Sequence, residues 1–371
     1  MSPLSIVILG LSITSSWGNG HATTYRALSK GLARRGHRVL FLERDVPWYA
    51  AHRDLPRSPF VTTRLYRDLD ELRSGFAGAI AAADLVILGS YVPEGVGVAR
   101  WMLQVASGVT AFYDIDTPVT LGKLRRADHE YLAPDLVPRF DLYLSFTGGP
   151  VLRLLAKQYG ARRPRPLYCS VDPDVHRPQA APRRWDLGYM GTYSADRQPG
   201  LEALLLAPAR TLPERAFVIA GPQYPPDLDW PTNVHRIEHL APARHAAFYG
   251  AQRFTLNLTR ADMVSAGWSP SVRLFEAAAI GTPIISDAWP GLESFFAPDR
   301  EILIARSGDE VVGYLCELDE AKRQQIAAAA RRRVLALHTL DHRALELERY
   351  VAEARAAPDA TTEAAAAKQV A

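Results

Sequence analysis

Residues 270–287 combine an arginine, a glutamate and a glycine stop in a pattern that could hold an anionic ligand. Arg273 and Glu276 are three positions apart, so a helix would present them on one side. The N-terminus of such a helix has free N–H groups that favour anions. Gly281 and Pro283 then end the helix before a predicted buried strand. The pattern suits a nucleoside diphosphate, and an ordinary helix–strand unit with two surface charges is the alternative.

A polar loop with two glycines, residues 12–20, follows the first predicted strand. Gly18 and Gly20 would let backbone N–H groups approach an anion or a sugar closely. Their spacing does not match the G-x-G-x-x-G fingerprint of dinucleotide-binding proteins. His21 opens the next helix and is a candidate general base, because imidazole can accept a hydroxyl proton at neutral pH. A histidine that only packs or caps the helix is the alternative.

Two carboxylates, Asp114 and Asp116, come directly after the strand predicted at residues 109–113. That position places them at the carboxyl edge of a parallel sheet, where open α/β sheets bind ligands. One of the two is expected to face the ligand. Both are candidate catalytic bases, and helix capping together with Thr117 is the alternative for Asp116.

The second half of the chain repeats the succession of strand, glycine and polar loop. Gly191 and Thr192 end one predicted strand, and Arg197 stands near the start of the next helix. Together they could hold phosphate oxygens, although a plain turn with a solvated arginine is the alternative. Three more strand ends carry candidates for contacts with a base or with the cleft: Gln223, His239 with Leu240, and Arg260.

Length and periodicity place these loops on two α/β domains. The chain has 371 residues, of which 48% are hydrophobic and 22% charged, enough for two separate cores. Short apolar runs alternate with helical patterns, as in doubly wound parallel sheets. We expect strands at residues 6–9, 36–42, 85–88, 109–113, 142–144, 186–191, 216–220, 234–237, 254–258, 283–286 and 302–304, and long helices at 317–338 and 342–355.

Prolines and composition shifts set the expected domain boundaries. Residues 1–160 are predicted to form an N-terminal Rossmann-like domain, and residues 183–340 a C-terminal one. The Pro- and Arg-rich segment 161–182 is the expected linker between them. Residues 341–355 are expected to form a last helix that packs back on the N-terminal domain, and residues 356–371 a flexible tail. The strand ends of two such domains would face a shared cleft.

Charge and cysteine content narrow the class of protein. The net charge of +3, from 43 basic and 40 acidic residues, gives no overall field for nucleic acid or an anionic membrane. Cys169 and Cys316 are far apart and lack metal-ligand spacing, which favours reduced thiols. We find no signal-peptide pattern and no apolar run long enough to span a bilayer. We therefore expect a cytoplasmic protein without a metal site, and peripheral membrane association stays open.

Five segments of the chain resemble GT-B glycosyltransferases of the group 1 type, most closely their CgeB or spore-maturation-like branch. The resemblance is carried by residues 17–21, 28–37, 113–120, 188–193 and, most strongly, 271–283. It implies a nucleoside-diphosphate-sugar donor held mainly by the C-terminal domain and an acceptor, either a glycan, a lipid-linked or a small molecule, bound by the N-terminal domain. It also implies that neither a cofactor nor a metal is required.

The resemblance assigns roles to the candidate residues. Glu276 becomes the carboxylate that binds the ribose, and Arg273 and Arg197 become neighbours of the diphosphate. Gln223 and the His239–Leu240 pair become the base site. Many group 1 enzymes carry a glutamate eight residues before the ribose glutamate, and here that place is Trp268. The stereochemical outcome therefore stays open, and Trp268 could stack on a sugar or base or simply be buried.

Two rival functions on the same fold stay open. A nucleotide-sugar epimerase would need several carboxylates and histidines in the cleft, and the sequence offers fewer than expected. A non-catalytic scaffold protein could keep the fold, because fold does not dictate function.

Overall fold

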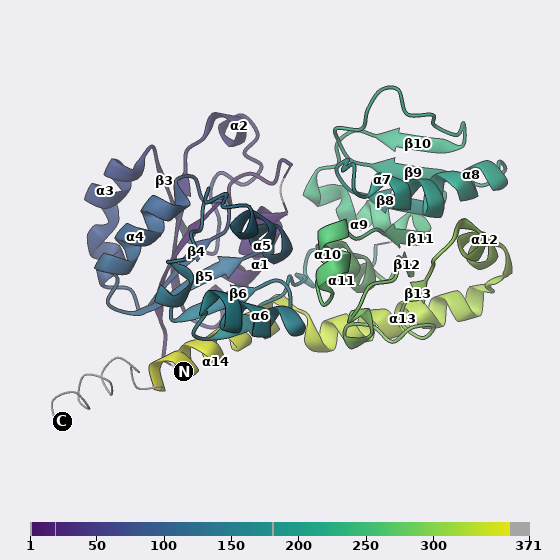
Figure 1. Ribbon diagram of the computed structural model, residues 1–371. Helices are drawn as coiled ribbons and strands as arrows, with labels where there is room; N and C mark the ends of the chain where they lie inside the picture. The colour runs from purple at the N-terminus through teal and green to yellow at the C-terminus, as the bar shows by residue number, and fades with distance from the viewer. Residues whose placement is uncertain (1, 19, 180–181, 357–371) are drawn as a thin grey trace.

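Two α/β domains lie side by side in the computed structural model of the protein, which describes residues 2–18, 20–179 and 182–356 (Figure 1). Each domain is built around one parallel sheet, of seven strands in the first and six in the second. The expected fold class, two doubly wound parallel-sheet domains, is therefore confirmed.

The first domain places helices on both faces of its sheet. Its strands are β1 (Ser5–Gly10), β2 (Arg38–Arg44), β3 (Thr62–Tyr66), β4 (Leu85–Gly89), β5 (Val109–Asp114), β6 (Leu142–Ser145) and β7 (Pro164–Pro166). Its helices are α1 (His21–Arg34), α2 (Pro47–Ala50), α3 (Leu69–Ala81), α4 (Gly95–Val105), α5 (Thr117–Arg125) and α6 (Pro150–Tyr159), with a 3₁₀ turn η1 (Val137–Arg139). The strands are ordered β3-β2-β1-β4-β5-β6-β7.

The second domain repeats this plan with six strands in the order β10-β9-β8-β11-β12-β13. These are β8 (Trp185–Met190), β9 (Phe217–Ala220), β10 (Val234–Ile237), β11 (Gln252–Asn257), β12 (Ile284–Ser286) and β13 (Leu303–Ile304). The helices are α7 (Gln198–Leu201), α8 (Ala207–Thr211), α9 (His245–Gly250), α10 (Ala261–Ala266), α11 (Val272–Ile280), α12 (Gly308–Glu317) and α13 (Glu320–Leu337), followed by α14 (Leu340–Ala356). Shorter turns are η2 (Glu202–Leu206), η3 (Pro242–Arg244) and η4 (Leu292–Ser294).

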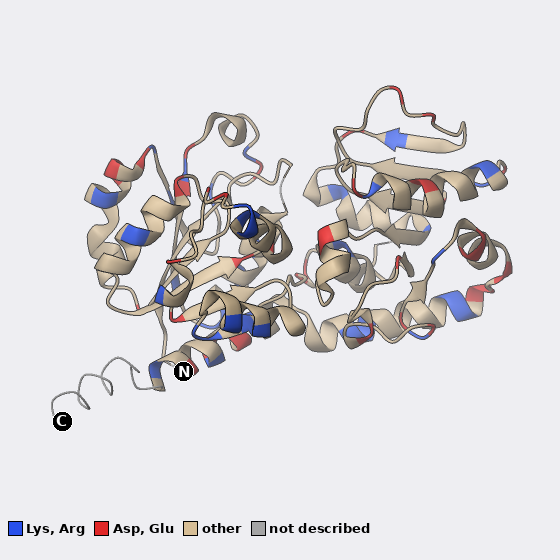
Figure 2. Cartoon of the chain, in the orientation of Figure 1, with Lys and Arg blue, Asp and Glu red and all other residues tan. Residues whose placement is uncertain are grey.

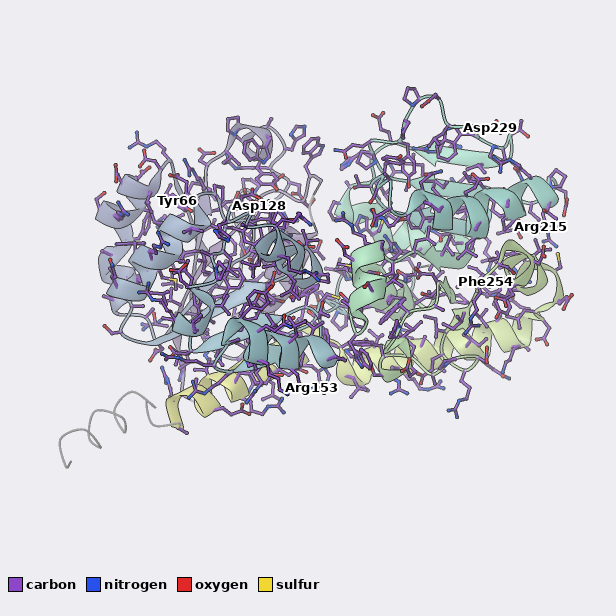
Figure 3. All side chains as sticks on the ribbon, in the orientation of Figure 1. Tyr66, Asp128, Arg153, Arg215, Asp229 and Phe254 are labelled. Atoms are coloured by element: carbon purple, nitrogen blue, oxygen red, sulfur yellow. The ribbon has the colours of Figure 1, made fainter. Side chains whose placement is uncertain are left out.

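Buried apolar strands form the core of each domain. All five residues of β4 are buried, as are the four of β9, because helices cover both faces of each parallel sheet. Tyr66 in the first domain and Phe254 in the second lie among tightly packed side chains (Figure 3). Continuous apolar runs of this kind are what made the central strands recognisable in the sequence.

Two edge strands, β3 and β7, lie outside the expected set. In β3 only Tyr66 is fully buried, so its apolar signal is weak. β7 pairs with β6 inside the segment that we expected to be a linker, so the start of that linker is wrong. Prolines are tolerated at a sheet edge, where a missing N–H breaks no ladder. The expected helix at residues 317–338 is also corrected, because Asp319 caps the separate helix α13 by accepting from the Lys322 N–H at 2.7 Å.

The last helix, α14, leaves the second domain and packs beneath the first (Figure 1). Glu348 accepts from Arg35 Nη2 at 2.8 Å and lies 2.7 Å from His37 Nε2. Arg355 Nη2 donates to Asp84 Oδ1 at 2.7 Å. The chain therefore crosses between the domains twice. Except for Ala356, the tail expected at residues 356–371 is outside the described part of the chain.

Charged residues of both signs are interspersed over the two domains (Figure 2). Cys169 is buried, Cys316 is exposed, and both are free thiols. Within the described part of the chain, every helix is too short or too polar to cross a membrane.

Candidate active site

Two adjoining cavities open between the carboxyl ends of the two sheets. The α11 cavity, of about 270 Å³, is lined by loops after β1, β8, β9 and β10 and by the start of α11. The His21 cavity, of about 530 Å³, is lined by loops after β1, β5, β6, β8 and β11. Both cavities share the residues Gly18, Gly20, Thr192, Ser271 and Val272. They form one cleft, at the place where open α/β sheets bind ligands.

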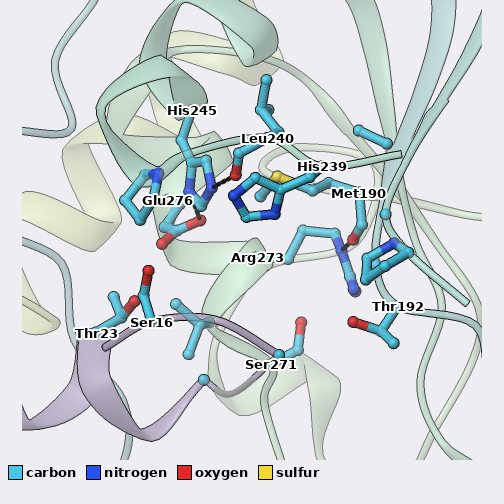
Figure 4. Close-up of a pocket in the computed structure, with 18 residues that line it drawn as sticks. Ser16, Thr23, Met190, Thr192, His239, Leu240, His245, Ser271, Arg273 and Glu276 are labelled. Carbon is cyan, nitrogen blue, oxygen red and sulfur yellow. Dashed lines mark hydrogen bonds and ion pairs between the residues drawn. The ribbon is translucent and has the colours of Figure 1, made fainter. Parts of the chain in front are cut away.

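Glu276 lies in the α11 cavity between two histidines, of which Figure 4 shows His245. Its Oε1 is 3.4 Å from His176 Nε2, and its Oε2 is 3.7 Å from His245 Nδ1. The Tyr249 hydroxyl donates to Oε2 at 3.4 Å. Burial opposes ionisation, but the two histidines outweigh it and hold the pKa of Glu276 well below its usual range. An ionised carboxylate at a cavity wall can accept hydrogen bonds from ligand hydroxyls.

Arg273 is fixed beside the same cavity by contacts with two strands, β8 and β11 (Figure 4). Its Nε donates to the Met190 carbonyl at 2.6 Å, and its Nη1 donates to Asn257 Oδ1 at 2.9 Å. Its guanidinium lies 4.8 Å from the ring centre of Tyr189. The N-cap residue of α11, Ser271, donates to Asn257 Oδ1 and does not cap the helix. The first N–H groups of α11 are therefore free of a side-chain cap and favour an anion.

The predicted glycine loops meet at the α11 cavity, as do His239 and Leu240. Gly18, Gly20, Gly191 and Thr192 all line it, together with the His239–Leu240 pair. A Cβ on Gly191 would lie 2.5 Å from the Tyr189 hydroxyl and 3.0 Å from Arg273 Nη2. The missing side chain therefore leaves room for the arginine.

His21 and Asp116 form a pair in the His21 cavity. His21 Nε2 lies 2.7 Å from Asp116 Oδ2. Asp116 stands at the N-cap position of α5, but its side chain accepts no hydrogen bond from the first N–H groups of the helix. Its carboxylate is therefore available to pair with His21. Burial opposes ionisation of Asp116, but His21 lowers the pKa of this carboxyl below its usual value. The pair can hold a proton next to a bound hydroxyl, which is the requirement for a general base.

Asp114 does not reach either cavity, so its place among the catalytic candidates is wrong. The side chain is fully buried, and Thr120 and Tyr143 each donate a hydroxyl hydrogen bond to it at 2.6 Å. Burial raises the pKa of Asp114 to about 7. β5 ends at Asp114, and the chain has turned toward α5 by Asp116, so the two carboxylates are not on one face of a strand and only Asp116 lines the cleft.

Of the remaining candidates, Arg197 and Arg260 line the His21 cavity and Gln223 lines neither cavity. Arg197 Nη2 donates to the Thr192 carbonyl at 2.7 Å, and its Nε is buried without a partner in the described structure. Burial and the nearby Arg273 and Arg260 lower the pKa of Arg197. Gln223 is exposed and lies outside both cavities, whereas its neighbours Gly221 and Pro222 line the α11 cavity.

Trp268 packs between the two domains and lines neither cavity. A Cβ on Gly149 would lie 2.5 Å from its indole ring, and one on Gly291 would lie 2.4 Å from it. The Trp268 carbonyl accepts from the Gly148 N–H at 3.0 Å. Of the two interpretations of Trp268, packing is the one that the structure shows.

The two histidines that contact Glu276 were not predicted. His176 lies in the expected linker, and His245 begins α9. Their partner, Glu276, is far away in the sequence, so no local spacing pointed to either residue. Only the close approach of the linker, α9 and α11 brings them together.

Comparison with known proteins supports a glycosyltransferase. Residues 197–349 match a family described as glycosyl transferase-like. A comparison with curated protein sequences finds no match.

Solved structures of glycosyltransferases share the fold over nearly the whole chain. A sucrose-phosphate synthase from Thermosynechococcus elongatus is 17% identical, with 94% of this chain and 98% of that chain covered and a TM-score of 0.68. HepE of Anabaena in complex with UDP-glucose is 13% identical, covers 94% and 100%, and has a TM-score of 0.67. An alpha-glucosyltransferase in complex with UDP-glucose and DNA is also 13% identical, covers 94% and 100%, and has a TM-score of 0.71.

The fold of the chain is thus that of the GT-B glycosyltransferases, and its C-terminal part is glycosyl transferase-like in sequence. The cleft between the domains is the candidate active site of this fold.

Proposed function

We propose that the protein transfers a sugar, a hexose, from a nucleoside-diphosphate sugar to an acceptor hydroxyl without a metal ion. One observation carries this proposal. The α11 cavity, with a fixed arginine and an ionised glutamate, opens directly into the His21 cavity, with a histidine–aspartate pair. The α11 cavity suits a sugar nucleotide, and the His21 cavity suits an acceptor.

The donor is assigned to the α11 cavity. Glu276 accepts hydrogen bonds from the ribose hydroxyls, and Arg273 and the first turn of α11 attract the diphosphate. The loops at Gly221 and at His239 border the base. Uridine is the first base to test, because HepE and the alpha-glucosyltransferase are both described in complexes with UDP-glucose.

The acceptor is assigned to the His21 cavity. Its oxygen attacks the anomeric carbon, the bond from that carbon to the diphosphate oxygen breaks, and His21 takes the hydroxyl proton. Arg273 and the N-terminus of α11 stabilise the charge that develops on the leaving diphosphate. A direct displacement of this kind inverts the anomeric configuration, and the configuration of the product tests it.

The acceptor class and the cellular setting are also proposals. The motifs of residues 17–21 and 113–120 favour the CgeB-like branch and a role in making a polysaccharide or glycoconjugate. We place the protein in the cytoplasm or at the periphery of a membrane, where a lipid-linked acceptor would lie.

A thermal-shift panel of UDP, GDP, dTDP, ADP and CMP tests the donor assignment, because a ligand that binds only the folded state stabilises it. We expect UDP to raise the melting temperature selectively. Glu276→Ala should weaken UDP binding by about 1–3 kcal/mol, the scale for lost hydrogen bonds to a charged group. Glu317→Ala, at an exposed glutamate of α12, is the matched control. An equal UDP-induced rise in melting temperature in both variants would mean that Glu276 does not contribute to the donor site.

Incubation with UDP-glucose alone separates the rival functions. A transferase hydrolyses UDP-glucose slowly to UDP and glucose, because water takes the place of the acceptor. An epimerase produces a second sugar nucleotide, and a scaffold protein leaves UDP-glucose unchanged.

A further inference from the structure

Both histidines that flank Glu276 have hydrogen-bond acceptors on each side of the ring. His176 Nε2 faces Glu276 Oε1 at 3.4 Å, and His176 Nδ1 faces the Asp172 carbonyl at 3.2 Å. His245 Nδ1 faces Glu276 Oε2 at 3.7 Å, and His245 Nε2 faces the Leu240 carbonyl at 3.3 Å. Each ring therefore joins one oxygen of the carboxylate to one backbone carbonyl.

This arrangement favours the charged form of the His176 ring. Carbonyl and carboxylate oxygens only accept hydrogen bonds, whereas a neutral imidazole has a single N–H. An imidazolium has two N–H groups, one for the Asp172 carbonyl and one that faces the Glu276 carboxylate. A protonated His176 therefore offsets the negative charge of Glu276 beside the α11 cavity.

The carboxylates of the linker do not compete for this histidine. Lys30 Nζ, on α1, lies 2.6 Å from Asp172 Oδ2 and 2.8 Å from Asp174 Oδ2, and Arg34 Nη2 lies 2.5 Å from Asp174 Oδ2, so two cations pair the two linker carboxylates. The other titratable neighbours are His239 in the α11 cavity, His245 and Tyr249 on α9, Arg273 on α11 and the Cys169 thiol, none of which is negative near neutral pH. Burial opposes charge on His176, but Glu276 outweighs it and raises the pKa of this histidine above its usual value.

We infer that His176 is a positioning residue for the donor, which when protonated fixes Oε1 of Glu276 and offsets the charge of this carboxylate under the sugar nucleotide. The inference rests on the proposed donor site. His176 does not have to touch the reacting atoms, because it acts through Glu276.

The sign of the pH dependence follows from the protonated form. A group whose pKa is raised by its partner keeps its stabilising effect at low pH and loses it as the pH rises through the raised value. Donor affinity should therefore be highest on the acidic side of neutrality and fall toward alkaline pH. UDP-glucose is the right probe, because both of its phosphates are esterified and keep a constant charge over this range.

Titration calorimetry with UDP-glucose at a series of values from about pH 6 to about pH 8.5 tests the inference. The wild type should bind about tenfold more weakly at the upper end, the scale of one charged hydrogen bond. His176→Gln, which keeps a neutral N–H donor, should bind more weakly at the acidic end and show a shallower slope. His129→Gln, at an exposed histidine, should keep the wild-type profile.

The alternative outcomes are distinct. A flat wild-type profile, or a His176→Gln variant with the wild-type slope, overturns the inference while leaving the donor site intact. Failure of the wild type to bind UDP-glucose at any pH contradicts the proposed donor and removes the basis of the inference. Urea unfolding of the wild type needs no variant: its unfolding free energy should fall as the pH rises through the same range, and a constant value contradicts a charged cluster.

Discussion

One ring nitrogen of His21 has a hydrogen-bond partner and the other has none in the described structure, and this difference determines which nitrogen can accept a proton. Nε2 faces Asp116 at 2.7 Å, whereas Nδ1 has no partner in the described structure. An ionised aspartate accepts the Nε2 proton and so leaves the lone pair on Nδ1. The aspartate therefore selects the tautomer in which Nδ1 can take a proton.

Replacing the aspartate by its amide tests this account. Asp116→Asn keeps the shape of the side chain but removes the charge that holds the tautomer and stabilises the protonated ring. We expect the kcat for UDP release from UDP-glucose to fall about 10²-fold or more, the contribution of a general base. The KM should change little, because the donor lies in the other cavity.

The control for this variant is Asp227→Asn, at an exposed aspartate of the second domain. This variant should keep the kcat and the KM of the wild type. An unchanged kcat in Asp116→Asn would mean that His21 does not act as the base.

Residue types and spacing predicted those parts of the site that one element carries. Arg273 and Glu276 share α11, and their three-residue spacing placed both at one cavity. The choice between Asp114 and Asp116 could not be made from the sequence, because it depends on where the extended chain ends. His176 and His245 were missed because only tertiary packing brings them to Glu276.

At the scale of elements, the turn after β8 lies against Arg273 of α11. Gly191 lies where a methyl group would meet Tyr189 and Arg273. Its φ is not positive, so the backbone accepts alanine and only space is at issue.

Gly191→Ala should therefore displace the guanidinium of Arg273 and weaken UDP binding about tenfold, the effect of losing one charged hydrogen bond. Gly313→Ala is the matched control, because nothing lies within 4 Å of a Cβ at that helical position. It should stabilise the fold by about 0.4–1 kcal/mol and leave UDP binding unchanged. Equal UDP affinity in the two variants, measured by calorimetry, would argue against a tight fit at Gly191.

Elements with a continuous apolar run or a clear helical period were predicted well, and the two edge strands of the first sheet were not. β4, which is buried throughout, begins where expected, at Leu85, and ends one residue later than expected, at Gly89. β3 and β7 were missed because an edge strand is half exposed, and prolines in β7 imitate a linker.

On the scale of the whole molecule, the two domains are tied together at several points around the cleft. Trp268 packs between Gly149 and Gly291, Thr147 Oγ1 lies 3.0 Å from Ser269 Oγ, and α14 binds the first domain through Glu348. The two halves of the proposed reaction are thus held on separate sheets but at a fixed distance. No sequence pattern in either domain could reveal this relation, because it depends on how the domains meet.

The central claim is that the α11 cavity holds the sugar nucleotide with Glu276 on its ribose. A crystal structure of the protein with UDP tests it most directly. We predict that both ribose hydroxyls lie about 3 Å from the Glu276 carboxylate, with the diphosphate at Arg273 and the first turn of α11. UDP bound elsewhere, or a ribose without contact to Glu276, would contradict the account.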